Sequence, residues 1–282
     1  MALGDQLNMS ALAGIHLYEP EELVLGAGPG TSRQAVLQAL DAANQMMAFE
    51  PVDLGPIYGR AAGEGSIGGI FACNLAGPRR LKAGAARDHL LGFRAVSGRG
   101  EIFKSGGRVV KNVTGYDLSK LMVGAYGTLA AMTEVTFKVM PKPEKTWTVL
   151  VLGLDPATAV RAMSAAMNSP HEVSSAGYLP AGLAVRSEVG HVAASEQSVT
   201  ALRVEGPGPS VEHRVAALRH EARYNSVEGR AVIVSFQREL DEVPASFGRF
   251  LAPQFDVDRS HRRLEDDLAL RRRFRVVDAR HL

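Results

Sequence analysis

The stretch GSIGGIFACNLAGPRR, residues 65–80, decides the fold of this chain. Small residues lead into an apolar run, which predicts a loop that enters a helix near Ile67–Leu75, with Ser66 as its capping residue. Glycine inside a helix costs about 0.5–1 kcal/mol relative to alanine, so Gly68 and Gly69 need a reason. Unpaired N–H groups and the positive end of a helix dipole favour an anion, most often a phosphate. The sequence therefore predicts a phosphate site here, and a glycine turn that only permits tight packing is the alternative.

Composition limits the classes of protein that this chain can represent. Its 282 residues, 46% of them hydrophobic, suffice for one large or two ordinary domains. A net charge of +2 gives no support for nucleic acid binding. The single cysteine, Cys73, excludes an internal disulfide, and the eight histidines show no spacing typical of metal ligands, so we expect no metal site. No apolar run is long enough to span a membrane and Met1–Ser10 lacks a secretion signal, so we expect a cytoplasmic location.

The first half of the chain predicts a mixture of short strands and helices. Asp117 is expected to cap a helix through Val123, and residues 132–139 alternate as in a half-buried strand. The remaining predicted elements are a strand at Glu22–Leu25, a turn at Gly26–Thr31, a helix at Arg33–Gln45, a strand at Met46–Phe49, and a hairpin of Leu91–Val96 with Glu101–Lys104.

The second half predicts a smaller α+β unit that begins after a proline-rich boundary at Pro141–Pro143. Strand, helix, strand, strand and helix follow in order, which is typical of a ferredoxin-like unit, and Ala231–Phe236 can supply its fourth strand. Arg259–Leu282 holds eight arginines against four acids, which predicts a solvated, poorly ordered tail. The five elements between boundary and fourth strand are Trp147–Leu152, Ala157–Asn168, Val173–Tyr178, Val199–Val204 and Val211–Glu221.

Several other motifs are candidates for chemistry. Gly26–Gly30 lies between a strand and a helix with Glu50 about 20 residues on, which resembles a dinucleotide fingerprint, although Pro29 removes an N–H group. Arg79 can pair with a phosphate or with the acids of a partner. Asp88-His89 is a titratable pair for which a structural role is favoured. No catalytic residue is assigned.

A second block, residues 111–118 followed by 124–129, combines a polar loop, a short helix and a glycine turn. Asn112, Thr114 and the backbone at Gly115 are able to hydrogen-bond a planar heterocycle, with a capped helix and glycine C-cap as the alternative.

The ordered set of motifs resembles the FAD-binding fold shared by vanillyl-alcohol oxidase and the FAD-linked 2-hydroxy-acid dehydrogenases. Within it, the chain is similar to the FAD-binding subunit of bacterial glycolate oxidase, the GlcE type. The resemblance covers roughly residues 10–245. It rests on residues 18–23, 49–51, 74–80, 87–92, 111–118, 122–124 and 202–210.

The resemblance implies a two-lobed α+β FAD-binding domain of the vanillyl-alcohol-oxidase type with a smaller ferredoxin-like second domain. We expect the first over residues 1–141, the second over 142–245 and a divergent tail over 246–282. In this family the subunit works beside a larger flavoprotein subunit and an iron–sulfur subunit, which implies association with the inner face of the cell membrane through partners. The implied FAD contacts are Pro51, Gly65, Ser66, Ile67, Gly68, Gly69, Asn74, Asn112, Thr114, Gly115, Tyr116 and Met132.

The chain also departs from the family pattern. Ala125 and Ala130 stand where serine and glycine are usual, and the match fades after about Val243. We expect the family's first strand and pyrophosphate loop to be missing ahead of Leu12. Two alternatives therefore stay open: a nicotinamide-dependent dehydrogenase that uses Gly26–Gly30, and a non-catalytic assembly module that no longer holds FAD.

Overall fold

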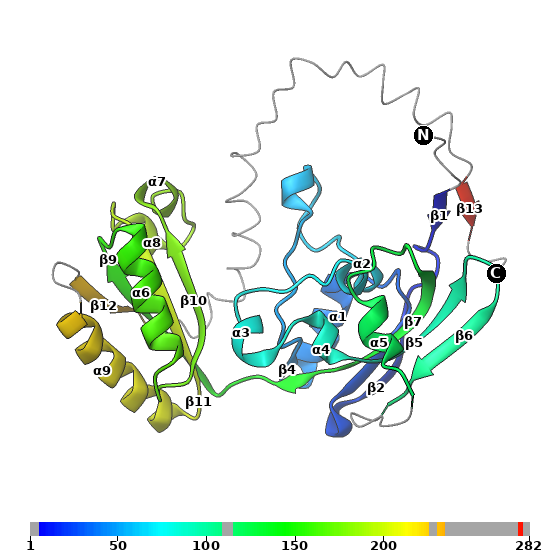
Figure 1. Cartoon of the computed structure of the whole chain (residues 1–282), viewed down its shortest axis with the longest axis horizontal. Coiled ribbons are helices and arrows are strands. Elements are labelled where there is room, and N and C mark those ends of the chain that lie inside the picture. The colour runs from blue at the N-terminus through cyan, green and yellow to red at the C-terminus, as the bar shows by residue number, and fades with distance from the viewer. Residues whose placement is uncertain (1–5, 109–114, 226–229, 235–275, 279–282) are drawn as a thin grey trace, which may run out of the picture.

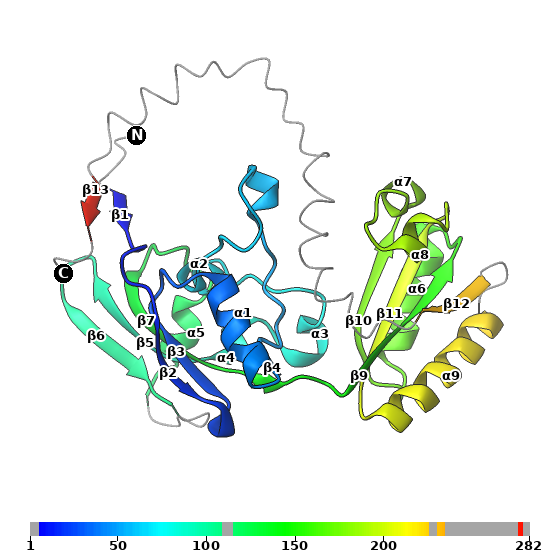
Figure 2. The same cartoon turned by 180° about the vertical axis from the view of Figure 1, so that it is seen from behind.

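The computed structural model describes residues 6–108, 115–225, 230–234 and 276–278. Two lobes lie side by side, each built on its own β-sheet (Figure 1). The chain passes from the first lobe to the second in the short segment between β8 (Met140–Pro141) and β9 (Lys145–Leu152), as the reverse view shows (Figure 2). The architecture is therefore α+β, as the sequence predicts.

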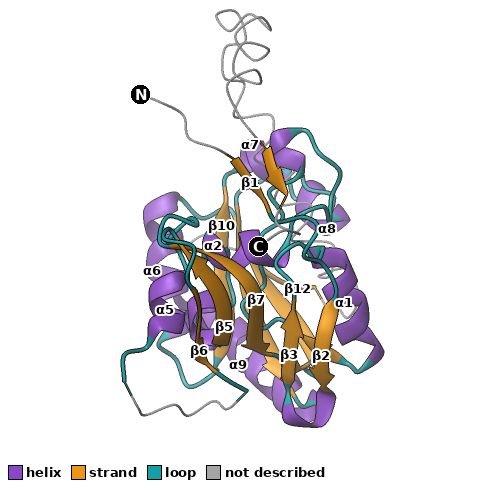
Figure 3. Cartoon of the chain, turned by 90° about the vertical axis from the view of Figure 1, so that its right-hand side faces the viewer, coloured by secondary structure: helices purple, strands orange, loops and turns teal. Residues whose placement is uncertain are grey.

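An antiparallel sheet forms the base of the N-terminal lobe (Figure 3). The hairpin predicted for Leu91–Val96 with Glu101–Lys104 is confirmed as the pair β5–β6. The strand expected at Glu22–Leu25 begins later, because Pro20 starts a 3-10 turn that ends with Leu23 in a left-handed conformation, φ 58°. Across the sheet the strands are β2 (Ile15–Glu19), β3 (Val24–Ala27), β7 (Ala130–Lys138), β5 (Leu90–Ser97) and β6 (Ile102–Gly106).

Short helices share one apolar core with this sheet. Val36 of α1 and Phe71 of α2 are fully buried with Leu25 and Phe137 of the sheet. Asp117 caps α5 as predicted, since its carboxylate accepts a 3.1 Å hydrogen bond from the N–H of Lys120. The helices are α1 (Arg33–Ala42), α2 (Ile67–Ala72), α3 (Arg80–Ala83), α4 (Ala86–His89) and α5 (Leu118–Met122).

Two predicted elements of this lobe are shorter than expected. The first helix ends at Ala42 rather than Gln45, because Asn44 takes a left-handed φ of 53° and turns the chain into β4 (Gln45–Met46). Strand β4 pairs with β8, and the strand expected over Met46–Phe49 extends only through Met46.

The C-terminal lobe has the predicted ferredoxin-like arrangement. Its sheet order is β10-β11-β9-β12 with every pairing antiparallel, and α6 and α9 contribute to a core on one face. Two short helices, α7 (Ala181–Ala184) and α8 (Gly190–Ala193), cover part of the opposite face. The main elements are β9, α6 (Pro156–Met167), β10 (Val173–Leu179), β11 (Val199–Gly206), α9 (Gly208–Asn225) and β12 (Arg230–Val234).

A small parallel pair joins β1 (Gln6–Asn8) to β13 (Val276–Asp278). Apart from β13, the predicted tail lies outside the described residues. Among the described helices, none combines the length and hydropathy that a membrane crossing requires.

Candidate functional site

The turn that enters α2 is tied into the neighbouring strand–turn–helix. Ser66 caps α2 as predicted: its Oγ accepts a 3.2 Å hydrogen bond from the N–H of Gly69. The N–H of Ile67 donates to the carbonyl of Thr31 at 2.9 Å. Two of the first amides of this helix therefore already have partners within the chain.

Gly68 is glycine because it packs against Pro29. A Cβ on Gly68 would lie 2.6 Å from the Pro29 Cβ, and the N–H of Gly68 donates to the Pro29 carbonyl at 2.8 Å. The expectation that bare amides await an anion is therefore wrong at positions 67–69. The tight-packing alternative holds for Gly68.

Gly65 and Gly69 differ from Gly68 because the chain leaves space beside them. A Cβ on Gly65 would meet no atom within 4 Å, and one on Gly69 would meet only the Ser66 Oγ, at 3.2 Å. Neither glycine has a positive φ, so backbone conformation does not require them. Missing side chains let a ligand approach the backbone closely at both positions. The Ser66 hydroxyl accepts its bond from Gly69, so its own proton can be donated to a ligand.

The other glycine turn, between β3 and α1, is filled by the chain itself. A Cβ on Gly28 would lie 2.4 Å from the Leu12 carbonyl oxygen, and one on Gly30 would lie 2.6 Å from a backbone oxygen of Ser10. The N–H groups of Gly28 and Gly30 donate to the carbonyls of Gly14 and Leu12. A dinucleotide phosphate would find these two amides already bonded, and the surrounding described strands pair antiparallel rather than in a βαβ unit.

The two sequence blocks of the resemblance lie against each other. The N–H of Gly124 donates to the Phe71 carbonyl at 3.1 Å, and the N–H of Tyr126 donates to the Ala72 carbonyl at 2.9 Å. Tyr126 takes a left-handed φ of 55° and is 72% exposed. The glycine turn at 124–127 therefore docks on the C-terminal end of α2 and brings the second block to the first.

Four candidate residues precede α5. Tyr116 is 92% exposed, and Gly115 is exposed with a positive φ of 82° that favours glycine. Asn112 and Thr114 lie outside the described residues. Contacts from this loop to a heterocycle stay a prediction.

The remaining candidates have partly structural surroundings. Pro51 is buried, and Met132 of β7 is 7% exposed within the apolar core, so only its backbone is suited to a ligand contact. Asn74 has a left-handed φ of 51°, and its Oδ1 accepts a 3.0 Å bond from the N–H of Arg87. Asn74 thus fixes the start of α4.

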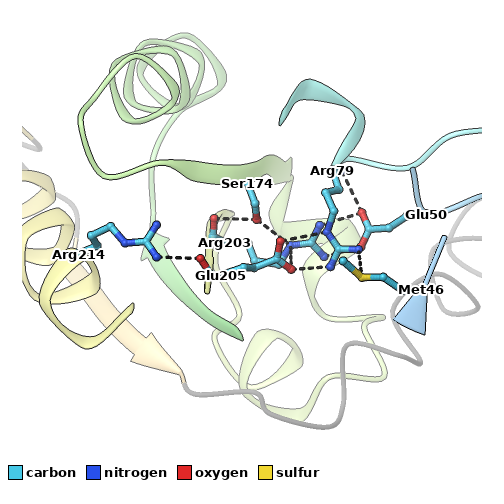
Figure 4. Close-up of polar contacts among 7 residues, drawn as sticks. All are labelled: Met46, Glu50, Arg79, Ser174, Arg203, Glu205 and Arg214. Carbon is cyan, nitrogen blue, oxygen red and sulfur yellow. Dashed lines mark hydrogen bonds and ion pairs between the residues drawn. The ribbon is translucent and has the colours of Figure 1, made fainter. Parts of the chain in front are cut away.

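Arg79 pairs with acids of its own chain instead of a phosphate. Its guanidinium binds both carboxylate oxygens of Glu205 in the second lobe (Figure 4). Burial acts to raise the pKa of Glu205, but the hydrogen bonds and charges of Arg79 and Arg203 outweigh it and hold that pKa below its usual value. Sequence reasoning missed this partner, which is far away along the chain.

His89 is a structural residue. It is 1% exposed, with Nε2 3.0 Å from the Ala83 carbonyl and Nδ1 3.3 Å from the Lys138 carbonyl. Burial lowers the pKa of His89, and the nearby charge of Lys138 acts in the same direction, against the hydrogen bonds to the two carbonyls. Within the part of the chain that the structure describes, no group of three or more His, Cys, Asp or Glu side chains is arranged to hold a metal ion.

A buried carboxylate that sequence reasoning did not single out anchors the loop ahead of Gly65. Asp53 is 2% exposed and accepts hydrogen bonds from the N–H groups of Gly55 and Gly63, at 3.0 and 2.6 Å. Burial lowers the pKa of the nearby Arg33, and the charge of Asp53 opposes that shift. The Asp-x-Gly spacing, typical of an Asx-turn, is the sequence signal for this anchor.

Comparison with known proteins finds one matching family for the N-terminal part of the chain. Residues 4–106 match the protein family described as FAD binding domain. The N-terminal lobe is therefore similar to FAD binding domains. In alkyldihydroxyacetonephosphate synthase a similar fold covers 88% of this chain and 47% of that chain, with a TM-score of 0.67 and 16% identity. At that identity the likeness concerns the fold alone.

Curated relatives are similar to parts of this chain. The glycolate oxidase subunit GlcE of Escherichia coli is 46% identical over 140 residues, which are 50% of this chain and 38% of that protein. The glycolate oxidase subunit GlcD of Bacillus subtilis is 45% identical over 87 residues, 31% of this chain and 18% of that protein. The D-lactate dehydrogenase of Anaerostipes hadrus is 32% identical over 148 residues, 52% of this chain and 29% of that protein. The chain thus spans less than two fifths of the length of these relatives.

Proposed function

We propose that the chain is the FAD-binding subunit of a multi-subunit glycolate, or related 2-hydroxy acid, oxidoreductase. The observation that carries this proposal is the 46% identity to the glycolate oxidase subunit GlcE over half of this chain. Its partners are then a larger flavoprotein subunit and an iron–sulfur subunit. The oxidation of glycolate takes place mainly on the larger subunit, and the location is cytoplasmic, with association to the inner face of the membrane through partners.

The proposed cofactor site follows the face of α2 where the chain leaves space. Gly65 and Gly69 admit the pyrophosphate close to the backbone, and Ser66 donates its hydroxyl proton to it. Ile67 and Gly68 belong to the same pyrophosphate loop, although their N–H groups are already bonded within the chain. The loop with Asn112, Thr114, Gly115 and Tyr116 lies on the isoalloxazine or adenine side, as does the backbone of Met132. Pro51 and Asn74 complete the proposed contacts. FAD, when bound, would serve as a two-electron acceptor.

The proposed domain division is 1–141, 142–245 and a tail over 246–282. Support for the first boundary comes from the apolar clusters, since one uses residues up to Val139 and the next begins at Val149.

One observation favours a second function, an assembly module without FAD. The amides of Ile67, Gly68 and Gly69 all donate to atoms of the chain. The start of the helix therefore offers fewer N–H groups to a phosphate than the sequence predicts. Such a module would join the same partner subunits and contribute no cofactor.

Two measurements on the purified chain separate these functions. Titration with FAD, followed by flavin fluorescence, gives saturable binding if the chain is a flavin subunit and none if it is only an assembly module. Coexpression with the two partner subunits then tests the complex: glycolate-dependent dye reduction should require this chain. The same activity without the chain would contradict the proposal. Repeating the assay with D-lactate compares the rates of dye reduction for the two acids.

A further inference from the structure

The two lobes meet through charged side chains rather than through a shared apolar core. Buried apolar residues of the N-terminal lobe form one cluster, and those of the C-terminal lobe form two others; none of these clusters combines described residues of both lobes. Relative motion is the default for domains that do not share a large apolar interface. The polar contacts between the lobes are therefore the interactions that can hold them in one orientation.

Besides one exposed ion pair, Lys82 with Glu172 at 3.6 Å, four shielded side chains make contacts across the junction, and we call them the interlobe quartet (Figure 4). They are Glu50 and Arg79 of the first lobe and Arg203 and Glu205 of β11. Both oxygens of Glu50 accept from Arg203, at 2.7 and 2.8 Å. Arg79 donates from Nε and Nη2 to Glu205, at 3.0 and 2.5 Å. All four side chains are only 10–13% exposed, so these two bidentate pairs are shielded from water and salt.

Each lobe contributes one arginine and one glutamate, and each lobe also holds a longer pair of its own. Arg79 Nη1 lies 3.5 Å from Glu50 Oε1, and Arg203 Nε lies 3.4 Å from Glu205 Oε1. If the lobes separate, each half keeps one positive and one negative group beside each other. An isolated buried charge is strongly destabilising, whereas a pair that remains neutral and becomes hydrated is not. The arrangement therefore permits reversible opening.

Contacts within each lobe hold both halves of the quartet in place. Glu50 takes a left-handed φ of 48°, and its Oε2 accepts a 3.0 Å bond from the N–H of Arg79. A Cβ on Gly77 would lie 2.7 Å from the Glu50 carbonyl oxygen, so glycine is needed for this approach. In the second lobe, Ser174 Oγ accepts from Arg203 Nε at 3.3 Å.

We propose that the interlobe quartet is a reversible latch: it sets the closed orientation of the two lobes and releases it without unfolding either lobe. The hinge is the segment between β8 and β9, where the chain connects the lobes. The quartet uses residues from three motifs of the family resemblance, 49–51, 74–80 and 202–210. It gives these residues a physical role that does not depend on any cofactor contact.

Distance measurements on the full chain test the latch. Nitroxide labels at Ile102 of β6 and Val160 of α6, both well exposed, report the separation of the lobes by pulsed electron resonance, with Cys73→Ser removing the native thiol. The unaltered quartet should give one narrow distance distribution. Arg203→Met should shift it to longer distances and broaden it, while far-ultraviolet circular dichroism stays unchanged.

Two further variants keep the proposal falsifiable. Glu205→Gln, a milder change, should broaden the distribution less than Arg203→Met. Glu212→Gln is the matched control, since it removes a pair with Lys145 that stays within the second lobe. A narrow, unshifted distribution in Arg203→Met would overturn the latch. Loss of secondary structure in both Arg203→Met and Glu205→Gln would also overturn it, because the quartet would then be part of a folding core.

Discussion

The two glycine turns of the N-terminal lobe look alike in sequence but differ in their surroundings. Each comes just before a helix, but the turn before α1 is covered by the backbone of residues 10–14, whereas the turn before α2 leaves space at Gly65 and Gly69. Glycine frequency alone therefore does not mark a ligand site. The two turns differ in what occupies the space beside the glycines. Backbone atoms of the chain fill that space before α1, whereas it stays largely empty at Gly65 and Gly69 before α2.

The largest expected effect comes from adding a methyl group to the covered turn. Gly28→Ala would place a Cβ 2.4 Å from the Leu12 carbonyl oxygen, and overpacking of this kind costs about 1–3 kcal/mol. Urea denaturation measures the loss. Gly98→Ala is the control, since its Cβ would meet no atom within 4 Å. Equal stability of the two variants would show that residues 10–14 do not cover this turn.

The next effect concerns the anchor of the loop that leads to the open turn. Asp53→Ala leaves the N–H groups of Gly55 and Gly63 without their acceptor, which costs about 1–3 kcal/mol. The exposed Arg60 should then be cut faster by trypsin. Glu64→Ala, an exposed change near the end of the same loop, should leave the cleavage rate as it is. Unchanged cleavage in Asp53→Ala would mean that the carboxylate does not hold this loop.

A pH dependence should come from the core beneath the open turn, where the ring of His89 lies 5.1 Å from that of Phe49 and the latter lies 5.8 Å from Phe71 of α2. The pKa of His89 is lowered in the folded state, so the unfolded chain binds more protons, and stability rises with pH. The contribution of neutral His89 to the free energy of unfolding should be complete above the ordinary histidine pKa of about 6.5. It should be lost as the pH falls below that value. Unfolding free energies from pH 7.5 to 5 check this. His89→Gln should flatten the slope, and an unchanged slope would assign the dependence to other groups.

Much of the local structure was predictable, because it depends on neighbours in sequence. Ser66 and Asp117 cap helices through residues three positions later, and the β5–β6 hairpin follows from its turn. Tight packing at Gly68 was one of two alternatives from the sequence, but its partner was not predictable, since Pro29 lies in another turn. Likewise, the partner of Arg79 is Glu205 in the other lobe, and no local pattern identifies it.

The smallest effect on stability is expected at the open turn itself. Gly65→Ala adds a methyl group to empty space, and an alanine in a compatible conformation loses less entropy on folding, so stability should rise by about 0.4–1 kcal/mol. Thermal unfolding measures this change. A clear loss of stability would show that Gly65 is confined by the chain, as Gly28 is.

Flavin affinity of variants at Gly69 tests most directly whether FAD lies on the open turn. Gly69→Asp would place a carboxylate against the diphosphate, and Gly69→Asn is its neutral control of nearly equal size. Fluorescence titration with FAD should show binding lost in Gly69→Asp and substantially retained in Gly69→Asn, with both variants folded. Equal FAD affinity of the wild type and Gly69→Asp would contradict the assignment of this turn as the flavin site.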